Sequence, residues 1–165
     1  MRLGPPRLRL WVVLVVLLAA QLAVRPWFAT SPFAPDFMLV ALLFFAMRSR
    51  PGAGAAAGFL VGLLSDAVAP TAFGAGAFAL TVIGYVAGWL KAVVFADNLL
   101  VTVVFVFAAS WLRDFLELAA SGALRAGAVG TQLLVLWPAS AIGTSAAAAI
   151  ALLLFRGLLR SAPAS

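Results

Sequence analysis

The sequence contains no cysteine and no histidine, and only 10% of its 165 residues are charged. Without these two residue types the chain has no disulfides, no thiol nucleophile, no imidazole base and none of the usual transition-metal ligands. A soluble domain carries roughly 25% charged residues, so the scarcity of charge excludes a water-soluble globule. We therefore expect neither a cofactor nor a metal site.

Hydrophobic residues are abundant instead, at 65% of the chain, and they form long apolar runs. This composition predicts an all-α integral membrane protein, with residues 1–165 forming a single polytopic domain in the lipid bilayer. Eleven Lys and Arg residues outnumber five Asp and Glu residues. The basic residues lie at the ends of segments and form no stripe, which fits the positive-inside rule and argues against a nucleic-acid partner.

Charges, prolines and glycines divide the apolar runs into six candidate transmembrane spans. The first run resembles a secretory signal, but its length and the lack of a small-x-small cleavage site favour an uncleaved span. The second is short for a bilayer that needs about 20 helical residues. It is tilted, begins earlier in the segment SPFAPD, or is re-entrant. The spans are residues 8–24, 35–47, 52–69, 74–94, 99–120 and 131–155.

The distribution of basic residues predicts that both termini are cytoplasmic. In a six-span topology only Arg25 and Arg125 lie outside, and Arg113 lies within the fifth span. Five spans would place Arg156 and Arg160 outside and so reduce the excess of basic residues on the cytoplasmic side. The residues expected on the cytoplasmic side are Arg2, Arg7, Arg9, Arg48, Arg50, Lys91, Arg156 and Arg160.

Small residues recur at helical spacing in three spans, where they allow helix backbones to approach closely. We expect the third, fourth and sixth spans to form a tight internal bundle, although such stripes also serve as docking surfaces for partners. The third span carries Gly54, Gly58 and Gly62, the fourth carries Gly84 and Gly88, and the sixth carries Ala139, Gly143, Ala147 and Ala151.

Asp66 stands alone in the apolar stretch GAAAGFLVGLLSDAVAPTAFGAGAFAL. At about 1.5 Å per residue it lies roughly 20 Å along its helix, in the outer part of the membrane, and Arg113 reaches a similar depth. Because a lone charge in hydrocarbon costs at least about 2.5 kcal/mol, we predict that Asp66 pairs with Arg113. Glu117, four residues after Arg113, is a rival partner on the same helix.

Asp114 points about 100° away from Arg113 around the helix, so it needs water at the outer interface or a partner protein. Its stretch, WLRDFLE, is the most polar of any span. The stretch is either functional or simply located at the water boundary. No nucleophile and base pair of a protease is present, and carboxylates near one face make no proton relay across the membrane. We therefore expect no enzymatic activity.

Three stretches, PDFMLVALLFFAMRSRPG, GFLVGLLSDAV and ALTVIGYVAGWLK, together with an intervening glycine, resemble the rod shape-determining protein MreD family. In that family a Pro-Asp opens the second span and a Gly-x-x-x-Gly-x-x-x-Asp pattern closes the third. WLRDFLE has no counterpart there, and residues 95–165 receive little from the comparison. The resemblance assigns structural and interaction roles to Pro35, Asp36, Gly58, Gly62, Asp66 and Gly74.

The resemblance implies a non-enzymatic protein of the bacterial inner membrane that binds MreC. It also implies a complex with MreB, RodA and a class B penicillin-binding transpeptidase, controlling peptidoglycan synthesis along the side wall. The alternative is the substrate-binding S component of an energy-coupling-factor vitamin transporter, to which MreD is similar in fold. Ala19 and Ala23 could imitate the docking patch of an S component, but few polar side chains are available to line a vitamin pocket.

Overall fold

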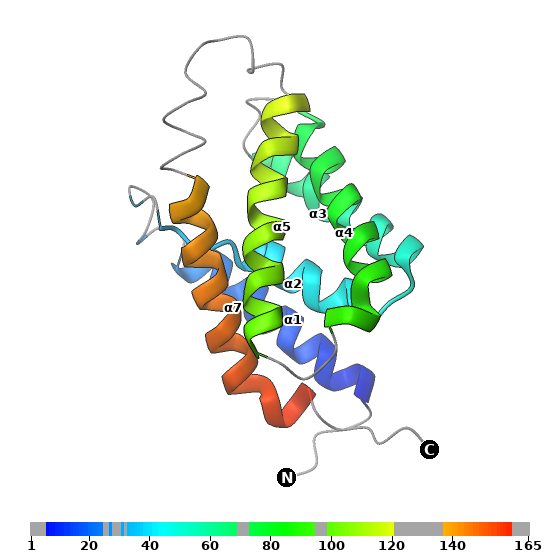
Figure 1. Ribbon diagram of the computed structural model, residues 1–165, viewed down its shortest axis with the longest axis vertical. Helices are drawn as coiled ribbons and strands as arrows, with labels where there is room; N and C mark the ends of the chain where they lie inside the picture. The colour runs from blue at the N-terminus through cyan, green and yellow to red at the C-terminus, as the bar shows by residue number, and fades with distance from the viewer. Residues whose placement is uncertain are drawn as a thin grey trace.

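The computed structural model describes residues 6–24, 27, 31, 33–68, 73–94, 99–120 and 137–159, and these residues form six α-helices (Figure 1). The six predicted helices are therefore confirmed, and the fifth has the predicted bounds. Residues 131–136 of the sixth predicted span lie outside the described residues. The helices are α1 Pro6–Val24, α2 Phe37–Ala46, α3 Pro51–Val68, α4 Ala75–Val94, α5 Leu99–Ala120 and α7 Trp137–Leu159.

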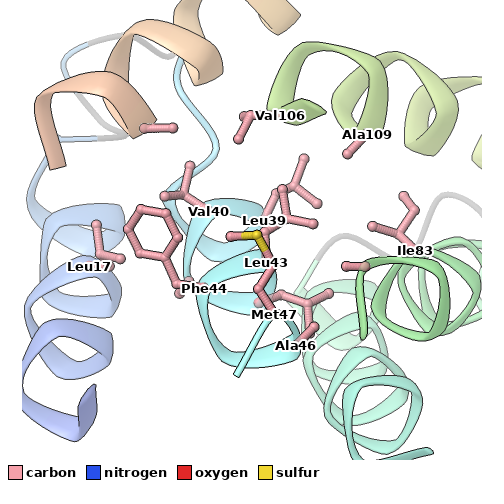
Figure 2. Close-up of a cluster of buried hydrophobic side chains, with 14 of the residues drawn as sticks. Leu17, Leu39, Val40, Leu43, Phe44, Ala46, Met47, Ile83, Val106 and Ala109 are labelled. Carbon is pink, nitrogen blue, oxygen red and sulfur yellow. The ribbon is translucent and has the colours of Figure 1, made fainter. Parts of the chain in front are cut away.

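Helix α2 is short and lies at the centre of the molecule. Its ten residues extend about 15 Å, half of the roughly 30 Å of bilayer hydrocarbon. It begins at Phe37, so it does not extend back into the SPFAPD segment. Seven of its ten residues are buried and the other three are partly buried, as expected of a helix that is apolar on every side. Figure 2 shows Phe44 directed toward Leu17 of α1, with Ile83 of α4 and Val106 of α5 near other faces of α2.

Helices α3 and α4 make the most extensive helix contact among the described residues, and glycines make it possible. A Cβ atom at Gly58 would collide with the carbonyl group of Leu80. One at Gly62 would lie only 2.6 Å from the carbonyl oxygen of Gly76, and one at Gly88 only 2.8 Å from the Cα atom of Pro51. The predicted tight packing of the third and fourth spans is confirmed. The seam also includes Gly54 and Gly84, whose backbones are in mutual contact.

The prediction that the sixth span joins this pair is wrong. Helix α7 packs mainly against α5, with smaller contacts to α1 and α2. Gly143 of α7 lies against the backbone of Phe33, in the segment that leads into α2. Small side chains permit close approach to any backbone, so a stripe of them does not determine which neighbour is chosen.

Large apolar side chains cover the exterior of the helices, which suits contact with lipid. Among the described residues, Trp137–Leu154 is the stretch that is long and apolar enough to cross a membrane by itself. Shorter apolar stretches occur at Val12–Gln21, Phe37–Ala46 and Ala75–Leu90. The exposed residues include Val15, Leu60, Leu64, Trp89, Leu100 and Leu154.

Candidate functional site

The first turn of α2 is held by its own cap residue and by side chains from α1 and α7. Asp36 caps the helix, because its Oδ1 accepts a hydrogen bond from the backbone N–H of Leu39 at 3.0 Å. The N–H of Asp36 donates to Oγ1 of Thr144 at 3.1 Å. The N–H of Phe37 donates to Oε1 of Gln21 at 2.9 Å. The N–H groups that a helix start leaves unpaired therefore find partners on α1, on α7 and in the cap itself.

Arg113 of α5 reaches this helix start and forms an ion pair with Oδ2 of Asp36. Its other terminal nitrogen lies 3.6 Å from Oε2 of Glu117, one helical turn along. The predicted pair of Arg113 with Glu117 is confirmed. The predicted pair with Asp66 is wrong, since Asp36 takes that place. Both carboxylates lie near the same end of the helix bundle, so depth along the helices could not distinguish them.

Asp66 is engaged elsewhere, where α3 ends and α4 begins. Its Oδ2 accepts hydrogen bonds from the backbone N–H of Gly74 at 2.9 Å and of Ala77 at 3.0 Å. Gly74 has φ of +97°, a backbone conformation that favours glycine. A Cβ atom at Gly76 would collide with the Asp66 carboxylate. Asp66 is thus a buried structural carboxylate that joins α3 to the start of α4.

Asp114 faces α7, so its hydrogen-bond partner lies in the same chain and not in the interfacial water or partner protein that we expected. The hydroxyl of Ser140 donates to Oδ2 of Asp114 at 3.1 Å. One turn further along α7, the hydroxyl of Thr144 donates to the carbonyl oxygen of Ser140 at 3.0 Å. Helices α5 and α7 are therefore linked by a short polar chain that runs from Asp114 to the cap of α2.

We call the set Gln21, Asp36, Arg113, Asp114, Ser140 and Thr144 the polar junction. It encloses one side of a partly open cavity of about 150 Å³, which Pro35, Ser65 and Ser110 also line. Two buried polar atoms here, Nε of Arg113 and Oγ of Ser110, have no hydrogen-bond partner among the described residues. The described residues therefore leave part of the hydrogen-bonding capacity of the cavity lining unused.

Sequence reasoning singled out Pro35, Asp36, Arg113, Asp114 and Glu117, and the structure brings these five residues together. It did not identify Gln21, Ser110, Ser140 and Thr144. Each of these four is a polar residue within an otherwise apolar helical run. In a membrane helix such residues face the protein interior because an unpaired polar group in hydrocarbon is costly, and this signal was available in the sequence.

The geometry defines an all-helical membrane protein whose few buried charges tie helices to one another. The sequence matches the family of the rod shape-determining protein MreD over residues 6–160, and the chain belongs to this family. No curated protein and no solved structure matches the chain. Members of the family are non-catalytic membrane proteins with a role in rod cell-shape determination, which confirms the prediction of a protein that is not an enzyme.

Proposed function

We propose that the protein acts by contact in the cell-elongation machinery of the bacterial inner membrane. In this proposal it binds an MreC-like protein and helps to organise or regulate peptidoglycan synthesis by RodA and its transpeptidase, together with MreB. The observation that carries the proposal is the family match over residues 6–160. The polar junction supports it, because its carboxylates and its arginine are engaged with one another and with helix starts, in structural roles.

We further propose a single domain of six spans, with both termini in the cytoplasm. The structure supports this topology through the pairing of helix ends. The polar junction joins the late parts of α1 and α5 to the early parts of α2 and α7, and Asp66 joins the end of α3 to the start of α4. Contacts between the ends of some helices and the starts of others are expected when consecutive helices alternate in direction across a membrane. A reporter fused behind Ser165 should accordingly remain in the cytoplasm, and its appearance outside would refute the topology.

The alternative of a vitamin-transporter S component is less well supported. The cavity does have polar lining, which favours a binding protein in principle. Its volume of about 150 Å³ is, however, below the roughly 300–1,000 Å³ of typical small-molecule sites. A vitamin bound to the purified protein would favour the transporter and contradict the proposed function.

Co-purification tests the proposal directly. The tagged protein, expressed with the MreC-like protein of the same bacterium, should retain that protein through detergent extraction and affinity purification. Gly52→Leu serves as the matched control, because a Cβ atom at Gly52 meets nothing within 4 Å and this variant should bind as the wild type does. Gly58→Leu should lose binding because its α3–α4 contact cannot form. A wild-type protein that folds but retains no MreC-like protein would overturn the proposed partner.

A further inference from the structure

The cavity at the polar junction carries more negative than positive charge. Two of its lining residues, Asp36 and Asp114, are acidic, and one, Arg113, is basic. Glu117 does not line the cavity, but its ion pair with Arg113 further offsets the charge of the arginine. Asp114 takes part in neither ion pair of Arg113. In a medium of low dielectric constant an excess of negative charge attracts a cation.

Of the two unpartnered atoms named above, Nε of Arg113 can only donate a hydrogen bond, whereas the buried hydroxyl of Ser110 can accept one from a ligand. Ser110 lines the cavity and is only 4% exposed, yet its Oγ has no hydrogen-bond partner among the described residues. Buried hydroxyl groups normally have partners, since an unsatisfied one costs about 1–3 kcal/mol. The hydroxyl of Ser140, which also lines the cavity, has two acceptors for its single proton, Oδ2 of Asp114 at 3.1 Å and the carbonyl oxygen of Trp137 at 2.9 Å. A donor placed in the cavity would satisfy Ser110 and meet the carboxylate of Asp114, which belongs to neither ion pair of Arg113.

We propose that this cavity binds a primary ammonium group. An ammonium group has three N–H donors, which suits a carboxylate and hydroxyl oxygens arranged around a small cavity, and its positive charge offsets the acidic excess. A volume of about 150 Å³ holds this group with a short carbon chain. The ligand is a free small amine or the ethanolamine headgroup of a phospholipid, and the two sources share the same chemistry. The inference stands apart from the proposed function, because it requires no partner of the elongation machinery.

The first experiment measures thermal unfolding of the full-length protein in detergent with increasing ethanolammonium chloride. We expect a saturable rise in the midpoint temperature, because a ligand that binds only the folded state stabilises it. Tetramethylammonium chloride and sodium chloride at the same ionic strength are controls, since neither cation has an N–H donor. An equal rise with all three salts would overturn the proposal.

Amino-acid substitutions test whether ethanolammonium binds in this cavity. Asp114→Asn should weaken ethanolammonium binding about tenfold, because a charge-assisted hydrogen bond becomes a neutral one. Ser110→Ala should also weaken binding while leaving the unliganded protein at least as stable, because its hydroxyl has no partner to lose. Ser145→Ala is the matched control, since Ser145 is buried with an unpartnered hydroxyl but does not line the cavity. Unchanged binding in Ser110→Ala, or equal weakening in Ser145→Ala, would overturn the proposed site even if Asp114→Asn does not fold.

The second experiment distinguishes the sources of the ammonium group. The wild-type protein and Ser110→Ala are placed in lipid nanodiscs containing phosphatidylethanolamine or phosphatidylcholine, whose quaternary ammonium has no N–H donor. A higher midpoint temperature in phosphatidylethanolamine for the wild type alone identifies the headgroup as the ligand. A response to free ethanolammonium without a lipid difference identifies a free amine. A response in neither experiment refutes the inference, whether or not the protein binds an MreC-like partner.

Discussion

The ion pair between Asp36 and Arg113 predicts a measurable coupling between α2 and α5. We would replace Asp36 with Asn, which removes the charge but keeps a residue that caps helices as well as Asp does. Arg113 would be replaced with Met, which keeps much of the side-chain length. The double variant completes a thermodynamic cycle that isolates the interaction from the capping role of Asp36.

The expected magnitude follows from the burial of the pair. Breaking a fully buried ion pair costs about 3–5 kcal/mol, because it leaves a charge without compensation. The side chains of Arg113 and Asp36 are 18% and 22% exposed, so water compensates part of that loss, and Glu117 remains as a second partner of Arg113. We expect each single variant to lose about 2–3 kcal/mol of unfolding free energy. The coupling energy should be about 1–3 kcal/mol, with the double variant less destabilised than the sum.

Unfolding in detergent with increasing denaturant provides the assay, followed by tryptophan fluorescence and by helical circular dichroism. The matched control is a second cycle that combines Asp66→Asn with Arg113→Met. Asp66 bonds to backbone N–H groups at the start of α4, so this cycle should give a coupling below about 0.5 kcal/mol. A larger coupling for positions 66 and 113 than for 36 and 113 would refute our assignment of the ion pair.

Three further predictions concern folding and activity. Gly58→Leu should prevent accumulation of folded protein, because its Cβ atom collides with the α4 backbone. The control Gly52→Leu should accumulate normally, and a normal yield of Gly58→Leu would contradict the packing of α3 on α4. Asp66→Ala should lose about 2–4 kcal/mol of unfolding free energy, because the N–H groups of Gly74 and Ala77 lose their acceptor. Asp66→Asn should lose less, since its amide oxygen still accepts, and equal losses would argue against the bonds to α4. The isolated protein should show no hydrolase or transferase turnover in assays of peptidoglycan precursors, and a measurable rate without partners would oppose a contact role.

The sequence predicted the helices well because residues that end a helix are easy to recognise in an apolar chain. Prolines, glycines and charges end each run, and the fifth span was predicted with the bounds that α5 has, Leu99–Ala120. The contact between α3 and α4 was also predictable, since glycines on both helices must face a backbone. In both cases the information lies within one helix or between consecutive helices.

The partners of the buried charges were not predictable in the same way. Counting residues along a helix gives depth, but it does not give the direction that a side chain faces or which helix lies opposite. Asp36 and Asp66 both lie near the outer end of the bundle in the proposed topology, so depth does not separate them, and the sequence analysis weighed only Asp66 and Glu117. Asp36 also stands just before its helix, where it was interpreted as a boundary residue. The same limit explains why the small-residue stripe of α7 was assigned to the wrong neighbour.

The polar start of α2 has a consequence for biogenesis. Asp36 is synthesised 77 residues before Arg113 and 108 residues before Thr144, the groups that complete its contacts. At about 5–20 residues per second, translation of those 108 residues takes roughly 5–20 s. The carboxylate of α2 must stay in interfacial water or in contact with the insertion machinery until Arg113 arrives. The backbone N–H of Asp36 waits longer, until Thr144 arrives. Chains that stop before α7 would retain an N–H group at the start of α2 that lacks the acceptor it has in the complete fold.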